Sequence, residues 1–171
     1  MVLKVTSIAC KPSRNWTGLI TYLAGILRAT LKMTFKFIGV ECWNQHDVED
    51  RVISLLLSNK GLKGKFPQCI ENFTWLQTLD LSHNQLSGYI PSDISTKLPY
   101  LISLYLSNNY FYGDIPQELA LLYRLQEFSV ANNLLEGPVP VFVSNVDVSL
   151  SYASNSGLCG GAPRSCDESL I

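Results

Sequence analysis

A phrase of 24 or 25 residues recurs four times in this chain and limits its fold more than any other feature. Its common pattern is L-x-x-L-x-L-S-x-N-x-L-x-G-x-I-P, although the first copy has Lys60 where the others have asparagine. A fixed period of this length predicts stacked, nearly identical units rather than one closed core. The copies begin at Val52, Leu76, Leu101 and Leu125, so successive starts lie 24, 25 and 24 residues apart.

Each part of the phrase has a structural reading. The L-x-L core alternates apolar and polar residues, as a half-buried strand does, and stacked copies of that strand form a short parallel sheet on a concave face. The asparagine that follows can hydrogen-bond to backbone groups that would otherwise be buried without partners. The pattern therefore predicts a leucine-rich-repeat solenoid of the α/β class, with later apolar residues filling its convex side. The asparagines expected to form this structural ladder are Asn84, Asn109 and Asn133.

One coil cannot fold alone. Its roughly seven apolar side chains contribute about 1.5–3 kcal/mol each on burial. Ordering the backbone costs about 1–2 kcal/mol for every residue of the coil. The coils therefore depend on their neighbours, and both ends need caps. We expect a degenerate N-terminal cap region at residues 1–51, four repeats at 52–147, and a C-terminal cap and tail at 148–171.

Composition excludes several classes of function. The chain has 13 basic and 14 acidic residues and a net charge of −1, so nothing favours nucleic acid as a partner. It lacks a run of about 20 apolar residues, so we expect no transmembrane helix in it. The N-terminus does not make a convincing secretory signal.

Two modification patterns concern the cysteines and asparagines. Cys159 and Cys166 follow the last repeat, where a disulfide would staple the C-terminal edge in oxidising surroundings; the alternative is two free thiols in a frayed tail. Asn15 and Asn72 each begin an N-x-T triplet and are candidate glycosylation sites, with Asn72 expected on the convex side.

The sequence offers no assembly for catalysis. No serine is framed as G-x-S-x-G, and the two histidines, His46 and His83, have no neighbouring ligands at metal-binding spacing. The carboxylates cannot be paired with any specificity. We therefore predict no enzymatic activity, no cofactor and no metal.

The variable positions of the strands are the candidate binding surface. Side chains between the core leucines are expected to project to solvent on the concave face, with three more residues just beyond the strands. Tyr105 is the best single anchor, because interface cores favour aromatic residues. Tyr110 and Tyr112 are expected to be exposed on the adjoining loop. For any one of these residues the alternative is a bystander on the surface. The candidate partner-binding residues are Asp80, His83, Tyr105, Asn108, Glu127 and Asn132.

The repeat consensus resembles that of the ectodomains of plant leucine-rich-repeat receptor kinases. Several further phrases, among them Gly39-Val40-Glu41-Cys42-Trp43 and Asn155-Ser156-Gly157-Leu158-Cys159-Gly160, resemble the probably inactive receptor-like kinases that bind somatic-embryogenesis-type co-receptors. The resemblance covers residues 36–167. It implies an extracellular or cell-surface glycoprotein module that binds a co-receptor ectodomain and modulates immune or developmental signalling. Full-length relatives are membrane-anchored.

The N-terminal region departs from that family. The family's cap carries a cysteine seven residues before Cys42, but Phe35 stands there, so Cys42 loses its expected partner. Residues 17–35 also lack the sequence that the family has at this position. Two explanations are a shifted reading frame and ordinary divergence. Two alternative interpretations stay open: a truncated or mispredicted gene product without its own function, and a secreted inhibitor of a cell-wall-degrading glycosidase. The small number of repeats argues against the inhibitor.

Overall fold

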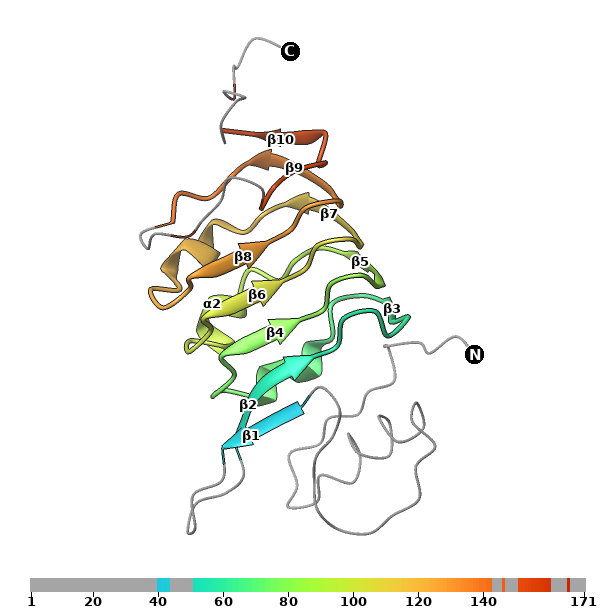
Figure 1. Ribbon diagram of the computed structural model, residues 1–171. Helices are drawn as coiled ribbons and strands as arrows, with labels where there is room; N and C mark the ends of the chain where they lie inside the picture. The colour runs from blue at the N-terminus through green and yellow to red at the C-terminus, as the bar shows by residue number, and fades with distance from the viewer. Residues whose placement is uncertain (1–39, 44–50, 143–145, 147–150, 161–165, 167–171) are drawn as a thin grey trace.

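The computed structural model describes residues 40–43, 51–142, 146, 151–160 and 166. These residues wind as a ladder of stacked coils (Figure 1), which confirms the predicted solenoid. Each of the first three coils supplies one strand to a first sheet, one strand to a second sheet, and one short helical turn, and the fourth coil supplies a strand to each sheet. The predicted N-terminal cap lies largely outside the described residues, as do Asn15, His46 and the segment 17–35.

The first sheet, here the concave sheet, is the one that the L-x-L pattern predicts. Its strands are parallel from the first repeat onward, and equivalent leucines of neighbouring coils are in register. An antiparallel strand at its N-terminal edge was not predicted, because it lies before the repeats and does not share their pattern. In spatial order the strands are β1 (Val40–Trp43), β2 (Arg51–Leu56), β4 (Thr78–Asp80), β6 (Ser103–Tyr105) and β8 (Glu127–Ser129).

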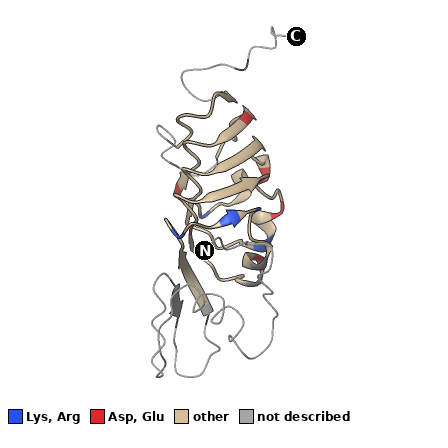
Figure 2. Ribbon diagram, turned by 90° about the vertical axis from the view of Figure 1, so that its right-hand side faces the viewer, with Lys and Arg blue, Asp and Glu red and all other residues tan. Residues whose placement is uncertain are grey.

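A second parallel sheet, here the flank sheet, runs along one side of the coils; Figure 2 faces that side. The prediction that Tyr110 and Tyr112 lie on a loop was wrong. Both residues lie in β7, because the extended backbone of each coil meets the same segment of the next coil. The strands, in chain order, are β3 (Lys63–Gly64), β5 (Gln85–Gly88), β7 (Tyr110–Asp114), β9 (Leu134–Pro138) and β10 (Gly157–Cys159).

Short helical turns close the convex side. They are η2 (Gln68–Asn72), α2 (Ile94–Lys97) and η3 (Gln117–Leu121). The apolar residues predicted to fill this side, Ile70, Phe73, Ile94, Leu98, Leu119 and Leu122, are all buried. Asn72 ends η2 on this side, and its side chain is outside what the structure describes. Lys97 bridges the carboxylates of Asp93 and Glu71, an exposed contact that adds little stability.

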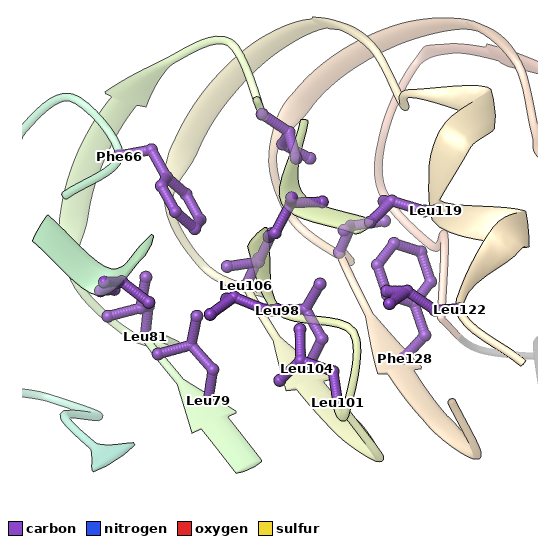
Figure 3. Packing of buried hydrophobic residues seen from close by; sticks show 14 of the residues in the cluster. Phe66, Leu79, Leu81, Leu98, Leu101, Leu104, Leu106, Leu119, Leu122 and Phe128 are labelled. Carbon is purple, nitrogen blue, oxygen red and sulfur yellow. The ribbon is translucent and has the colours of Figure 1, made fainter. Parts of the chain in front are cut away.

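The core is one continuous column of apolar side chains enclosed by the two sheets and the convex turns. Figure 3 shows leucines of successive strands, such as Leu79 and Leu104, pointing into the same interior as the convex residues Leu98 and Leu119. Because strand side chains alternate between faces, burying these leucines obliges their neighbours to face outward. The core thereby sets which residues the concave sheet presents.

Asparagine side chains connect each coil to the next inside this core. The Asn109 carboxamide oxygen accepts a hydrogen bond from the Leu86 backbone N–H at 3.0 Å. Its amide nitrogen donates to the backbone oxygens of Leu81 at 3.0 Å and Leu106 at 3.1 Å. Asn84 and Asn133 make equivalent bonds in their own coils. Each asparagine thus pairs backbone groups that the turn leaves buried.

A further rung lies beyond the predicted repeats. Asn155 accepts from the Leu135 backbone N–H at 3.1 Å and donates to the Val130 oxygen at 3.0 Å. Residues 151–160 therefore continue both the ladder and the flank sheet as a partial fifth coil. The predicted disulfide between Cys159 and Cys166 is present, with 4.9 Å between the Cα atoms, and it fastens the end of this coil. The boundary between residues 147 and 148 lies outside the described residues and stays a prediction.

Candidate protein-recognition surface

Strand register arranges the outward side chains of the concave sheet in two rows. One row contains Leu56, Asp80, Tyr105 and Ser129, each paired with the next across neighbouring strands. The other row contains Ser54, Thr78, Ser103 and Glu127 in the same way. The structure therefore brings three of the predicted binding residues, Asp80, Tyr105 and Glu127, onto adjacent strands of one face.

Tyr105, Ser103 and Glu127 form a hydrogen-bonded group at the centre of this face. The Tyr105 hydroxyl donates to Glu127 Oε2, and Ser103 Oγ donates to the same oxygen at 2.8 Å. Ser103 is 7% exposed. Ser103 lies between Leu101 and Leu104 and faces outward, but it is not open to solvent as expected for this position, because the glutamate of the next coil binds its hydroxyl.

These hydrogen bonds fix the charge of the group. The Tyr105 hydroxyl, and after it the Ser103 hydroxyl, lower the pKa of Glu127 below its ordinary value. Burial, and then the hydrogen bond to Glu127, raise the pKa of Tyr105. Glu127 thus stays ionised and Tyr105 stays protonated over a wider pH range than either would alone. At neutral pH the group presents one negative charge and one oriented phenol.

Asp80 supplies a second carboxylate in the row of Tyr105. Its Oδ1 accepts hydrogen bonds from the Ser82 backbone N–H at 2.9 Å and from Ser82 Oγ at 2.6 Å. Strands β4, β6 and β8 contain two charged residues, Asp80 and Glu127, and both are acidic. Tyr105 therefore lies between two carboxylates on this face.

The remaining candidates lie at one rim of the concave sheet. His83, Asn108 and Asn132 occupy equivalent positions with φ of 54°, 57° and 55°. The left-handed region is tolerated best by Gly, Asn, Asp and His, so the backbone explains these residue types without a partner. His83 and Asn108 lie together, with Nε2 and Nδ2 3.4 Å apart, and His83 and Asn132 are exposed. Their proposed role in binding therefore depends on exposure alone.

Sequence reasoning missed an aromatic stack that precedes the concave strands. The rings of Trp75 and Tyr100 are stacked with centroids 4.8 Å apart, and the Arg124 guanidinium lies 5.7 Å from the Tyr100 centroid. All three residues stand immediately before the first leucine of a repeat. That shared position was the available signal, because equivalent residues of stacked coils become spatial neighbours.

The described residues include no group of three or more histidine, cysteine or acidic side chains that could hold a metal ion. Among the same residues, no helix is both long enough and apolar enough to cross a bilayer. The chemistry that this surface offers is hydrogen bonding, charge and aromatic contact, which are the means of protein recognition.

Comparison with known sequences agrees with this architecture. Residues 74–121 match the family model described as leucine rich repeats (2 copies). Over 73 residues, 43% of the chain, it is 47% identical to the inactive LRR receptor-like serine/threonine-protein kinase BIR2 of Arabidopsis thaliana. Over 67 residues it is 49% identical to a probable inactive receptor kinase of the same plant. The matches span 12% and 11% of those proteins, about a tenth of their length.

Solved ectodomains match over much more of both chains. The BIR2 ectodomain of Arabidopsis thaliana is 40% identical with a TM-score of 0.56, covering 77% of this chain and 80% of that one. A chain in the crystal structure of the BIR3–SERK2 complex of the same plant is 37% identical with a TM-score of 0.55, covering 74% and 78%. The SOBIR1 ectodomain, 24% identical with a TM-score of 0.69, supports the fold alone; it covers 85% of this chain and 95% of its own.

Proposed function

Because this chain belongs to the leucine-rich-repeat ectodomains of plant receptor-like kinases, we propose that it is a non-enzymatic module whose concave sheet binds a co-receptor kinase ectodomain. Support comes from the solved complex of BIR3 with SERK2, in which one chain is 37% identical to this one. The observation that carries the proposal is the position of Tyr105 between the carboxylates of Asp80 and Glu127.

The geometry of this group favours tight contact at low entropic cost. A tyrosine that is already held by a hydrogen bond to Glu127 loses little side-chain freedom when a partner covers it. Leu56, which is exposed in the same row, adds apolar area beside the anchor. The two carboxylates would select a partner with basic residues at the matching positions and reject an acidic one.

The proposed consequence is regulation by occupancy. A module that binds a co-receptor ectodomain reduces the amount of co-receptor that is free to join other receptors, in proportion to its concentration relative to its dissociation constant. This role needs no catalysis by the chain and places it at the cell surface, where such ectodomains meet. It would tune immune or developmental signalling.

Calorimetric titration with the SERK2 ectodomain tests the proposal. We expect binding by the unmodified chain, and a dissociation constant raised about tenfold or more by Tyr105→Ala, because central aromatic anchors carry much of the binding energy. Asp80→Lys should weaken binding similarly by placing a positive charge against a basic partner.

Tyr110→Ala and Glu118→Lys are matched controls, because Tyr110 and Glu118 lie in β7 and η3, away from the concave sheet. Both should leave the dissociation constant within about twofold. If the folded chain shows no binding at high micromolar concentration, or if the controls weaken binding as much as Tyr105→Ala, the proposal is wrong.

A further inference from the structure

The outer face of the flank sheet carries a cluster of exposed large side chains, here the aromatic patch. It consists of Tyr89, Tyr110, Tyr112 and Leu134, which are 67%, 55%, 43% and 62% exposed. Tyr112 and Leu134 are paired in register, and the rings of Tyr89 and Tyr112 meet edge to face at 4.8 Å. The four side chains therefore form one contiguous surface rather than scattered exposed residues, and such surfaces mark interaction sites.

The patch is held in place by the backbone beneath it. The Tyr89 ring lies over Gly113, where an added Cβ would come within 2.7 Å of two ring carbons. Gly113 also has a φ of 77°, a conformation that residues with side chains rarely adopt. Glycine here lets the ring of one coil rest against the strand of the next. The aromatic surface is thus ordered before any partner arrives.

Charges of opposite sign lie at the two ends of the patch. Lys63 and Lys65 lie in and next to β3, at its N-terminal end. Asp114 and Glu136, which are paired in register on β7 and β9, lie two residues beyond Tyr112 and Leu134 along the same strands, at the diagonally opposite edge of the patch. Figure 2 shows the blue segment of β3 below the red segments of the strands nearer the C-terminus. The surface therefore has an apolar centre, one basic end and one acidic end.

We propose that the flank sheet is a self-association surface that binds a second copy of this chain. A two-fold axis that lies above the patch, parallel to the sheet and diagonal to its strands between Tyr89 and Tyr112, exchanges the two ends. It brings the Lys65 region of one copy opposite the Glu136 region of the other, and the tyrosines of both copies together at the centre. The strands of the two sheets then cross at nearly a right angle, which is one of the two ways in which sheets pack face to face.

A second copy fits because the surface is complementary to itself. Two-fold symmetry makes each contact occur twice. Both basic ends therefore face acidic ends, and no two ends of like charge face each other. The dimer would leave both concave sheets uncovered. Self-association and the proposed co-receptor binding therefore use different surfaces. The dimer would present two concave sheets for binding.

The size of the patch sets the strength of the dimer. An aromatic side chain buries roughly 200 Å² at most, so the exposed parts of the four side chains offer about 400 Å² per copy. Stable complexes bury about 800 Å² per partner. We therefore expect a reversible dimer with a dissociation constant on the order of 10–100 μM.

Sedimentation equilibrium of the full chain between about 2 and about 200 μM tests this directly. We expect a monomer–dimer equilibrium that weakens as salt rises, because the paired ends are exposed to screening. Lys65→Glu alone and Glu136→Lys alone should each raise the dissociation constant about tenfold, since each reversed contact occurs twice. The double variant exchanges the signs of the two ends and should return the constant to within about threefold of the original.

Reciprocal controls separate this surface from the concave sheet. Tyr110→Ala should weaken the dimer about tenfold, whereas Tyr105→Ala should leave it unchanged. A chain that stays monomeric throughout the concentration range overturns the proposal. So does a dimer that resists both charge reversals, a double variant that does not recover, or a dimer that Tyr105→Ala disrupts. Recovery in the double variant also shows that the single variants dimerise weakly because the charges at positions 65 and 136 no longer attract, and not because the chain is misfolded.

Discussion

Replacing Asn109 by alanine should lower the free energy of unfolding by about 3–5 kcal/mol, because it leaves several buried backbone groups without partners. The carboxamide pairs the N–H of Leu86 and the carbonyls of Leu81 and Leu106, and Asn109 is buried in the middle of the ladder. Alanine supplies neither a donor nor an acceptor. Denaturant unfolding monitored by circular dichroism measures the loss.

Asn108→Ala is the matched control for this prediction. The same amide is removed one residue earlier, from a half-buried side chain at the rim whose Nδ2 lies 3.4 Å from His83 Nε2. Its cost should be about 1 kcal/mol, mainly because alanine disfavours the φ of 57° at this position. Equal losses in the two variants would show that the ladder does not hold the coils together.

Replacing Phe111 by alanine should destabilise the protein by about 3–5 kcal/mol, the range for truncating a fully buried aromatic side chain. Phe111 is 0% exposed and its ring centroid lies 6.4 Å from that of Phe66. It stands in the third repeat where the other three copies have leucine, so the surrounding coils are packed around a larger side chain. The empty space cannot close without moving β7.

Tyr110→Ala, at the adjacent residue of the same strand, provides the comparison. Tyr110 faces outward and is 55% exposed, so the monomer should lose about 0.5 kcal/mol or less at concentrations too low for self-association. Thermal and denaturant unfolding of both variants measure the difference. A loss below about 1 kcal/mol for Phe111→Ala would mean that this segment is not a packed strand of the flank sheet.

Features that repeat within each copy could be predicted from the sequence. The spacing of Leu79, Leu104 and Phe128 predicts which side chains enter the core, and the fixed place of Asn84 and Asn109 predicts the ladder. These predictions depend on the pattern inside one coil and on stacking alone. The predictions of the concave sheet and of the buried convex residues depend on the same within-coil pattern, and the structure confirms both.

Features that arise between coils were harder to predict. The flank sheet forms from strands as short as the two residues of β3, and its recurring glycines read as turns in a linear sequence. The hydrogen bond from Tyr105 to Glu127 joins residues 22 positions apart, and it depends on the exact register of β6 and β8. The glycines recur with the same period whether their segment turns or forms a strand, and the contact between Tyr105 and Glu127 occurs only once.

At the ends of the solenoid the disulfide between Cys159 and Cys166 was predicted, but the secondary structure was not, because the ends vary from the repeat. Asn155 completes the ladder, but the residues around it do not follow the leucine pattern closely enough to be read as a fifth coil. The antiparallel β1 likewise precedes the first repeat. Caps differ from repeats because one of their faces meets no further coil. That face contacts solvent and must be polar, so the sequence of a cap differs from the repeat pattern.

A crystal structure of this chain bound to the SERK2 ectodomain tests the central claim most directly. We predict that the partner covers Tyr105 and places basic side chains beside Asp80 and Glu127, while the aromatic patch of the flank sheet stays outside that interface. A complex in which both outward rows of the concave sheet remain open to solvent would contradict the account.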